Sequence, residues 1–554
     1  MRDLTTASVP RDGWDAIVIG TGIGGATLGH ALASAGWRVL FCEKGKATRA
    51  ARGLRGDYAE RFVTRSADPR QVLARAGRTS EAVLDRTCGD APFIPFTGSG
   101  AGGSSGLYGM AMERFDPIDF APRARFAAAE ETTLPERWPI AYEDLALHYA
   151  TAERLYRVRG AQDPLRSDDA RALSPPPPLS ERGRGLSAFL EQKGMHVYRV
   201  PLACDFTAGC RYCQGYLCPA DCKVDGMRAC LAPAIERHGA TLLDDCNVVR
   251  LAATGRAVTE IVCDRRGEML RLRGSVVVLA AGALGTPGIL LASASDAWPD
   301  GLANRSGLVG RNLMRHFNDL YALFLPGVSG DDGNRQKELA FNDFYATADA
   351  KFGTVQSFGR LPPAEVILRS LRDDARAGPH AWRSGLIGLA SPLMAPFLRR
   401  IVARSTVLAT IVDDPPYADN RVTLVGQASG TAAPALAIEY RIRPADAARI
   451  ARQRALMRDL LKPLRFLLIR QAENARLLAH ACGTCRFGDD PRTSVLDADN
   501  RAHGFDNLYV VDASFMPSSG GTNPGLTIAA NALRVAAQLL GRPVTPLEAS
   551  NDAT

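Results

Sequence analysis

Residues 15–25 read Asp-Ala-Ile-Val-Ile-Gly-Thr-Gly-Ile-Gly-Gly, an apolar run followed by closely spaced glycines. The run at 15–19 lacks polar alternation, which predicts a buried parallel strand. Gly20, Gly22 and Gly25 match the G-x-G-x-x-G spacing, which provides a tight turn, close approach to a pyrophosphate and close packing of the following helix. This combination predicts a Rossmann-like dinucleotide-binding turn.

A second short apolar run, residues 39–41, is followed by Glu43, which stands 23 positions after Gly20. The helix after the glycine turn offers unpaired N–H groups and the positive end of its dipole to a phosphate. An acid at the end of the second strand accepts hydrogen bonds from ribose hydroxyls. We therefore expect Glu43 to bind the adenosine ribose and to disfavour a 2′-phosphate.

The composition indicates a large globular protein. The chain has 554 residues, of which 46% are hydrophobic, so it can bury a core without disulfides or bound metal. Its length predicts about two to four domains and excludes peptide toxins, fibrous repeats and disordered tails. The net charge is +8, from 67 Lys and Arg against 59 Asp and Glu scattered among one another. Such scattering predicts a solvated surface and no nucleic-acid binding.

The sequence contains neither a secretory signal nor an apolar run of membrane-spanning length. The first 14 residues are polar, so a cytoplasmic protein is expected. The apolar stretch 385–398 has 14 residues and contains Pro392 and Pro396, whereas a spanning helix needs about 20 residues. No transmembrane segment is predicted, and the stretch is interpreted as buried or covered by a subunit. The alternative is a monotopic patch for a membrane or a partner, and export or membrane association through a partner also stays open.

Helix and strand patterns alternate toward both ends of the chain, which is typical of an α/β protein with a parallel sheet. The middle, from about 310 to 480, is mixed, and no internal repeat emerges. The further predicted strands lie at 240–243, 248–251, 275–280 and 421–424, and the predicted helices at 232–238 and 444–461.

A second glycine-rich segment, residues 98–110, reads Gly-Ser-Gly-Ala-Gly-Gly-Ser-Ser-Gly-Leu-Tyr-Gly-Met. Together with residues 15–25 it resembles the glucose-methanol-choline (GMC) family of FAD-dependent oxidoreductases, which carry G-x-x-x-G-G-S-S-x-x-x-G-M here. Residues 138–145, 281–287 and 480–528 agree with further stretches of that family. The resemblance covers nearly the whole chain, apart from about residues 320–420.

The resemblance implies an α/β fold, α+β overall, with two domains and an active site between them. A Rossmann-like FAD-binding domain is expected from residues 1–114, 225–305 and 489–554. A substrate-binding domain with an antiparallel sheet and helices is expected from residues 115–224, which include a Cys-rich loop, and from 306–488.

The resemblance also implies FAD as the cofactor. The loop from Gly102 to Ser105 corresponds to the family segment along the pyrophosphate and flavin, where a Cβ would collide with the cofactor. Residues 105–108 lack the His to which some members attach the flavin, so non-covalent FAD is expected. The expected cofactor-binding residues are Gly20, Gly22, Gly25, Glu43, Gly102, Gly103, Ser104, Ser105, Val248, Asp512, Asn523 and Pro524.

Two C-terminal motifs carry the expected catalytic residues. Residues 480–488 resemble the family's H-x-x-G-T-x-R-x-G, and 520–525 its second active-site strip. A neutral imidazole suits removal of a hydroxyl proton near pH 7, so His480 is the expected base. Asn523 does not titrate in this range and is expected to orient the alcohol. His503 is the nearest competitor and is interpreted as structural.

The family resemblance implies oxidation of an alcohol to an aldehyde or ketone by hydride transfer to flavin N5. For the electrons of the reduced flavin, we prefer a quinone, a cytochrome or another acceptor to oxygen. The acceptor could be a partner protein. The alternatives are an oxygen-using alcohol oxidase, an FAD-dependent lyase or decarboxylase, and an electron-transfer subunit. A sugar or other polyol and a bulky aliphatic or aromatic alcohol both remain open as substrates.

Seven of the 12 cysteines fall between Cys204 and Cys246. Thiols this close can ligate zinc or an iron–sulfur cluster, form a disulfide, or remain structural thiols. Residues 218–223 also resemble a stretch of certain family dehydrogenases, some of which hold an electron-relaying three-iron cluster. No metal is firmly predicted, and the possible cluster ligands are Cys210, Cys213, Cys218 and Cys222.

Overall fold

A computed structural model gives the fold of the chain. It describes residues 10–47, 54–63, 66–87, 89–126, 131–166, 173–327, 337–359, 361–377, 382–426, 435–478 and 480–544.

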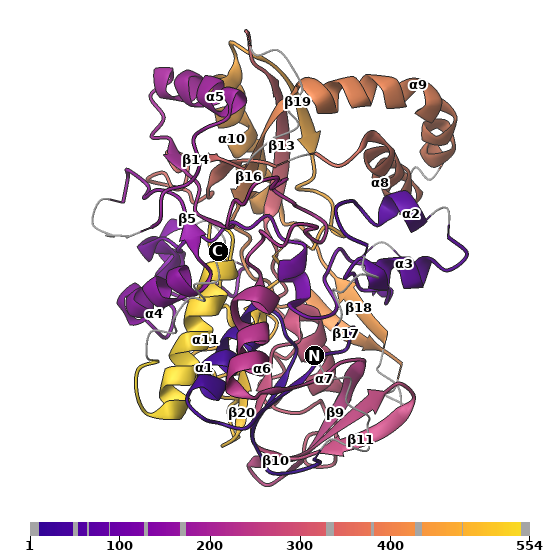
Figure 1. Cartoon of the computed structure of the whole chain (residues 1–554), viewed down its shortest axis with the longest axis vertical. Coiled ribbons are helices and arrows are strands. Elements are labelled where there is room, and N and C mark those ends of the chain that lie inside the picture. The colour runs from indigo at the N-terminus through magenta and orange to yellow at the C-terminus, as the bar shows by residue number, and fades with distance from the viewer. Residues whose placement is uncertain are drawn as a thin grey trace.

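A five-stranded parallel sheet forms the core of the lower half of the molecule in Figure 1. Its order is β20-β12-β1-β2-β8, and every neighbouring pair is parallel. The strands are β1 (Trp14–Ile19), β2 (Val39–Cys42), β8 (Thr241–Leu243), β12 (Gly274–Leu279) and β20 (Leu508–Val510). The predicted strands at 15–19, 39–41, 240–243 and 275–280 are confirmed. Three distant parts of the chain therefore build one sheet.

Helices and a small antiparallel sheet surround this core. Helix α1 (Ile23–Ser34) packs on α11 (Gly525–Leu540), and α11 packs on α4 (Tyr142–Leu155). The predicted helix at 232–238 is α6 (Ala232–His238), and α7 (Gly282–Ala292) follows β12. The antiparallel sheet, in the order β11-β10-β9, consists of β9 (Cys246–Thr254), β10 (Ala257–Arg265) and β11 (Glu268–Leu272), which confirms the strand predicted at 248–251.

A six-stranded antiparallel sheet dominates the upper half (Figure 1). Its order is β19 (Arg465–Arg470), β13 (Phe317–Phe324), β16 (Thr406–Val412), β15 (Val355–Ser357), β14 (Leu339–Phe341) and β6 (Tyr198–Arg199). Helices α5 (Glu181–Gln192) and α10 (Pro444–Leu461) share a hydrophobic cluster with it. The α/β fold with a second, antiparallel sheet is confirmed, as is the helix predicted at 444–461.

A four-stranded sheet connects the two halves. It contains β17 (Arg421–Val425), β18 (Ala435–Glu439), β3 (Val83–Asp85) and β4 (Ala91–Phe93), and β18 pairs with β3 in parallel. The strand predicted at 421–424 is thus confirmed. Because this sheet joins strands from both expected domains, the domain boundaries themselves stay a prediction.

The remaining elements are short. Helices α2 (Glu60–Val63) and α3 (Pro69–Arg75) and strands β5 (Val158–Arg159) and β7 (Leu202–Ala203) lie between the large units. Single helical turns lie at Gly103–Gly106, Pro117–Phe120, Pro122–Arg125, Met227–Leu231 and Ala513–Phe515.

Helices α8 (Ala364–Ala377) and α9 (Arg383–Arg404) form an arm at the upper right of Figure 1. The expectation that residues 385–398 are buried within the chain is wrong, because Leu389 and Leu393 are 81% and 84% exposed. The apolar helix is also longer than the 14-residue run, since it continues through residues 399–404. Residues 384–404 are long and apolar enough to cross a membrane by length and composition alone.

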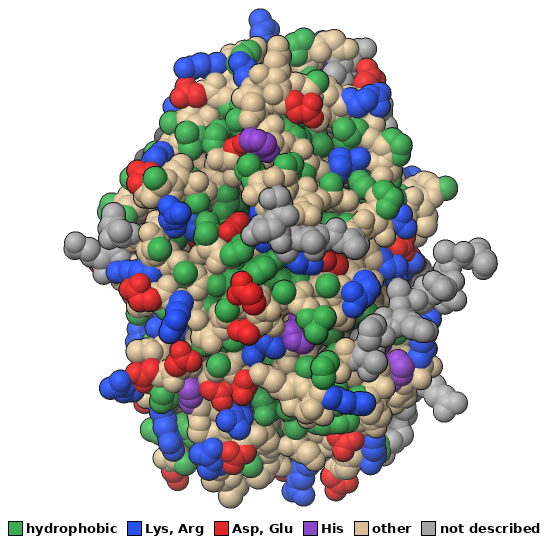
Figure 2. All heavy atoms as spheres, turned by 90° about the vertical axis from the view of Figure 1, so that its left-hand side faces the viewer, with side chains coloured by type: hydrophobic (Ala, Val, Ile, Leu, Met, Phe, Trp, Pro, Cys, Tyr) green, Lys and Arg blue, Asp and Glu red, His purple; other side chains and the backbone are tan. Residues whose placement is uncertain are grey.

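Charged side chains are mixed over the face that carries α4 and α5. Figure 2 shows Lys and Arg interspersed with Asp and Glu there, without a gathering of one sign. On this face the distribution is that of an ordinary solvated surface.

Candidate active site

The glycine turn between β1 and α1 leaves space where a pyrophosphate is expected. A Cβ added to Gly20 would lie 2.3 Å from the Ala280 carbonyl oxygen, and one on Gly25 would lie 2.2 Å from the Gly20 carbonyl oxygen. A Cβ on Gly22 would meet no atom within 4 Å. Gly20 and Gly25 therefore serve close packing, whereas Gly22 borders open space at the N-terminus of α1, which has no side-chain cap. This arrangement fits a bound anion.

Glu43 joins the two glycine-rich loops. Its Oε2 accepts hydrogen bonds from the N–H and the hydroxyl of Thr21, at 3.2 and 2.6 Å. Its Oε1 accepts from the N–H groups of Gly45 and Gly100, at 3.0 and 2.9 Å. Each carboxylate oxygen thus accepts two bonds, which uses its ordinary capacity. The structure gives Glu43 a scaffolding role, and its contact with a ribose stays a prediction.

The loop at 102–105 is held against the first glycine turn. Gly102 and Gly103 have φ values of +85° and +53°, and a Cβ on Gly103 would come within 3.0 Å of the Gly22 Cα. Ser105 donates to the Gly102 carbonyl at 2.6 Å and accepts from the Gly226 N–H at 2.9 Å. Ser104 accepts from the Gly98 N–H at 2.9 Å. Glycine is required here because two backbones approach closely at positive φ.

Two further expected cofactor residues lie near this cradle. Val248 is buried in β9, whose first residue, Cys246, donates its N–H to the Glu43 carbonyl at 2.9 Å. Asp512 is also buried and accepts from the Gly282 N–H and the Ser514 N–H, each at 2.9 Å. Burial raises the pKa of Asp512. The protein therefore uses Asp512 to fix its own turns.

His480 and His316 are hydrogen-bonded to each other. Their Nδ1 atoms lie 2.8 Å apart, and His316 Nε2 lies 2.9 Å from the Gly520 carbonyl oxygen. A backbone bridge between Met314 and Cys482 brings the two segments together. His480 has φ +62°, in the left-handed region that a non-glycine residue rarely adopts. The histidine pair thus depends on a local backbone that the fold constrains.

The hydrogen bonds determine which nitrogen of His480 carries the proton and which carries the lone pair. Burial lowers the pKa of His316, so His316 is neutral. A carbonyl oxygen only accepts, and therefore His316 Nε2 carries the proton and its Nδ1 accepts from the Nδ1–H of His480. This leaves the lone pair of His480 on Nε2, 3.4 Å from the amide nitrogen of Asn523. Asn523 can donate to that lone pair.

The charge state of His480 also suits a base. Burial lowers its pKa well below the usual value, and repulsion from a protonated His316 and from Lys337 would oppose protonation further. Lys337 is 7% exposed, and burial lowers its own pKa to about 8. His480 therefore remains neutral at pH 7.

The strip before α11 retains unused polar atoms. Among the described residues, the Thr522 hydroxyl and the Asn523 Oδ1 are buried without a hydrogen-bond partner. Pro524 occupies the N-cap of α11, which has no side-chain cap. A buried helix N-terminus with unsatisfied groups fits a polar ligand. Gly22, the cradle at 102–105 and this strip together fit FAD.

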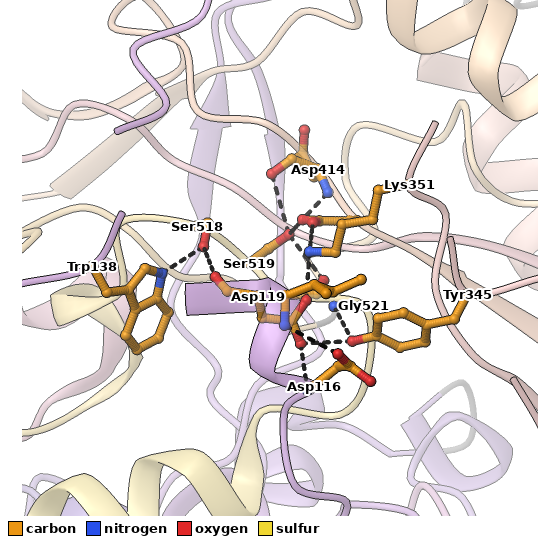
Figure 3. Close-up of polar contacts among 12 residues, drawn as sticks. Asp116, Asp119, Trp138, Tyr345, Lys351, Asp414, Ser518, Ser519 and Gly521 are labelled. Atoms are coloured by element: carbon orange, nitrogen blue, oxygen red, sulfur yellow. Dashed lines mark hydrogen bonds and ion pairs between the residues drawn. The ribbon is translucent and has the colours of Figure 1, made fainter. Parts of the chain in front are cut away.

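A buried ionic network holds this strip in place (Figure 3). Lys351 pairs with Asp119 at 2.5 Å and also with Asp413, and all three side chains are nearly inaccessible. The Ser519 hydroxyl donates to Asp413, and Tyr345 donates to Asp119 at 2.6 Å. Ser518 extends the network, because its hydroxyl donates to the Asp119 carbonyl at 3.4 Å and accepts from the Trp138 indole N–H at 2.7 Å. Charges paired in this way fix the strip at several points.

His503 lies outside this constellation. Its Nε2 lies 2.8 Å from the Ser494 hydroxyl, and burial lowers its pKa. The contact is consistent with the structural interpretation of this residue.

The Cys-rich loop gathers its thiols. Cys210 Sγ lies 3.7 Å from Cys204 Sγ and 3.1 Å from Cys222 Sγ, and Cys218 Sγ lies 3.5 Å from Cys222 Sγ. Hydrogen bonds with Cys204 and Cys222 lower the pKa of the Cys210 thiol. Such a donor set suits a soft metal ion or an iron–sulfur cluster. The tightest group contains Cys204 and not the expected Cys213, because a backbone bridge places Cys204 opposite Lys223.

A second group of thiols was not predicted from the sequence. Cys42, Cys246 and Cys263 come from β2, β9 and β10 and are buried together in the main hydrophobic cluster. Because the hydrophobic core surrounds these three cysteines, we interpret them as packing residues.

Comparison with known proteins agrees with this geometry. GMC oxidoreductase models match residues 188–318 and 416–532. The 6'''-hydroxyparomomycin C oxidase of Streptomyces lividus is 32% identical over 94% of this chain and 90% of that protein. The chain belongs to the GMC oxidoreductase family. A second relative of this GMC oxidoreductase, paromamine 6'-oxidase of Streptomyces fradiae, is 30% identical over 95% of this chain and 91% of that protein.

The fold of this GMC oxidoreductase is shared with pyridoxine 4-oxidase from Mesorbium loti, at a TM-score of 0.61 and 21% identity, over 96% of this chain and 100% of that one. The expected family, fold class and enzyme class, an oxidoreductase that acts on alcohol groups, are confirmed. Sequence reasoning missed His316, Lys337 and Lys351. No local motif marks these three residues, and only the fold places His316 and Lys337 near His480 and connects Lys351 to the strip through Asp413.

Proposed function

We propose that this GMC oxidoreductase oxidises a hydroxyl group of a small polyhydroxylated molecule, with His480 as the base and Asn523 as the orienting residue. The observation that carries the proposal is the chain of hydrogen bonds from the Gly520 carbonyl through His316 to His480. It fixes the proton of His480 on Nδ1 and presents the Nε2 lone pair beside Asn523.

The reaction follows from these groups. The amide nitrogen of Asn523 can donate to the oxygen of the substrate hydroxyl, whose proton then points to His480 Nε2. Asn523 Oδ1, which has no partner among the described residues, can accept from another polar group of the substrate. His480 Nε2 then takes the hydroxyl proton while the carbinol carbon loses a hydride. FAD, when bound in the glycine cradle, supplies the hydride acceptor. The alcohol loses two electrons and two hydrogens and becomes an aldehyde or ketone.

An amino sugar is the proposed substrate class. The two relatives act, by their names, on paromamine and a hydroxyparomomycin. A small polar cavity beside Thr522 is lined by the carboxylates of Glu113 and Asp163 and also by Arg114 and Arg166. Both carboxylates are 4% exposed, and buried carboxylates attract ammonium groups strongly. This polar lining supports a hydroxylated substrate over an aliphatic or aromatic alcohol, and the names of the two relatives support amino groups on that substrate.

The test is anaerobic reduction of bound flavin by paromamine, a neutral polyol and a long-chain alcohol. Bleaching by paromamine, and its slowing by about 10²–10⁴-fold in His480→Ala, would support the proposal. Unchanged reduction in His480→Ala would remove His480 as the base. Bleaching by the long-chain alcohol alone would exclude the amino-sugar assignment.

For the electron acceptor, we propose an acceptor other than oxygen, reached through the Cys-rich loop. Lys223 follows Cys222 directly, and its amine donates to the Gly106 carbonyl at 2.9 Å. Gly106 ends the turn that is expected along the flavin. The thiols of Cys204, Cys210 and Cys222 therefore adjoin the cofactor cradle and could hold an iron–sulfur cluster.

An oxygen-using oxidase is the second candidate, because both reported relatives are named oxidases. An iron assay with EPR, together with turnover in a dye or in oxygen, separates the two. Iron-free protein that turns over with oxygen alone would support the oxidase.

A further inference from the structure

Helix α9 exposes a continuous apolar stripe. Trp382, just before it, and Leu386, Leu389, Leu393 and Phe397 are 65%, 55%, 81%, 84% and 67% exposed. Successive members are three or four residues apart, so they lie along one side of the helix. A surface helix of a globular protein normally turns this side toward the core. Helix α9 instead turns its apolar side toward the solvent.

The opposite side of α9 packs against the protein. The helix contacts α8, and the Arg399 guanidinium pairs with Glu365 of α8 at 2.6 Å. Ser384 is 4% exposed, and Ile387 and Met394 are partly buried. The exposed stripe therefore does not result from a detached helix, because the inner side already has its contacts.

The charge of the segment is of one sign. Residues 383–404 include Arg383, Arg399, Arg400 and Arg404 and no Asp or Glu. Arg400 and Arg404 are exposed and continue the line of the apolar stripe at the C-terminal end of the helix. An apolar side with a basic end is the pattern of helices that lie at an anionic lipid surface.

Both ends of α9 are attached to the same body, so the helix cannot cross a membrane alone. Arg182 of α5 donates to the carbonyls of Arg404 and Ala403, at 2.8 and 3.2 Å, and β16 begins at Thr406 within the large sheet. At the other end, α8 contacts α2. A spanning helix would have to separate these two attachments by the thickness of the bilayer, about 30 Å of hydrocarbon.

We propose that α9 is a monotopic membrane attachment, in which the stripe enters the headgroup and acyl boundary of an anionic bilayer and the arginines meet lipid phosphates. A second copy of this chain fits the segment less well. In a two-fold pairing of α9 with itself, Arg400 and Arg404 of each copy would face a helix that has no carboxylate. Lipid phosphates supply that missing charge.

The test uses the full-length chain and vesicles of phosphatidylcholine with or without phosphatidylglycerol. We expect the protein to float with the anionic vesicles, and binding to weaken in high salt. Leu389→Gln combined with Leu393→Gln should lower partitioning by at least about tenfold, because each removes a largely exposed apolar group from the lipid. Arg400→Gln should lower it by about fivefold.

A matched control is Leu147→Gln on α4, which removes another leucine that is 62% exposed and should leave binding unchanged. The rate of flavin reduction should be the same in all these variants, so the result does not depend on the proposed reaction. Failure of the protein to bind anionic vesicles would overturn the proposal. So would a dimer in solution that the double variant dissociates, because the stripe would then be an interface between copies.

Discussion

Replacing His316 by Phe tests whether its hydrogen bond fixes the tautomer that lets His480 act as the proposed base. The substitution keeps a ring of similar size at a fully buried position but removes the acceptor for the Nδ1–H of His480, 2.8 Å away. His480 then loses the bond that fixes its tautomer, and its proton can move to Nε2, where the lone pair is needed.

The magnitude follows from one lost hydrogen bond at a buried donor. Leaving such a donor unsatisfied costs about 1–3 kcal/mol. Since about 1.4 kcal/mol is tenfold in rate, the rate constant for flavin reduction should fall by about 5- to 150-fold. This loss is smaller than the roughly 10²–10⁴-fold expected when the base itself is removed.

The assay is stopped-flow reduction of bound flavin under anaerobic conditions, with the melting temperature and FAD content measured for each variant. His316→Gln can still donate to the Gly520 carbonyl and accept from His480, so it should recover much of the rate. His503→Phe removes a histidine outside the site and should leave the rate unchanged. A folded, FAD-loaded His316→Phe enzyme that reduces flavin at the wild-type rate would refute the tautomer argument.

Three further results are expected. Lys351→Met leaves two buried carboxylates without their cation and should lower the free energy of unfolding by about 3–5 kcal/mol, measured by urea denaturation; an unchanged midpoint would contradict this. Gly22→Ala should weaken FAD binding with little change in apoprotein stability, because its Cβ enters open space, whereas Gly25→Ala should lower the apoprotein melting temperature, because its Cβ lies 2.2 Å from a carbonyl oxygen. Flavin reduction should show no inflection near pH 6.5, because His480 has a lowered pKa and is already neutral there. The rate should rise near pH 8, where Lys337 loses the charge that weakens the base, and this rise should vanish in Lys337→Met.

Much of the fold follows from local patterns. The predicted helices at 232–238 and 444–461 match α6 and α10 residue for residue, and the first strand is one residue longer than predicted. Hydrophobic periodicity determines such elements because it acts over a few residues. The glycine spacing at 20–25 likewise determines the turn, since only glycine fits the close approaches found there.

The arm at α8 and α9 shows where local patterns mislead. The apolar composition of residues 385–398 predicts that they are buried. Composition gives the hydrophobicity of a segment, but it does not say which side of the helix faces the solvent. Whether a stripe meets the core or the solvent depends on how the helix is attached at both ends. The pairing of β16 with β13 and the bonds from Arg182 set this attachment in the folded chain.

The sequence by itself determined the family, the cofactor cradle and the two residues expected to act on the alcohol, because each lies in a short motif whose spacing carries its chemistry. Only the tertiary structure decided which nitrogen of His480 carries the lone pair and what holds the strip at Asn523. His316 lies 164 positions from His480, and Lys351 lies 62 positions from Asp413. Contacts over such separations are set by strand pairing and packing, and no local spacing encodes them.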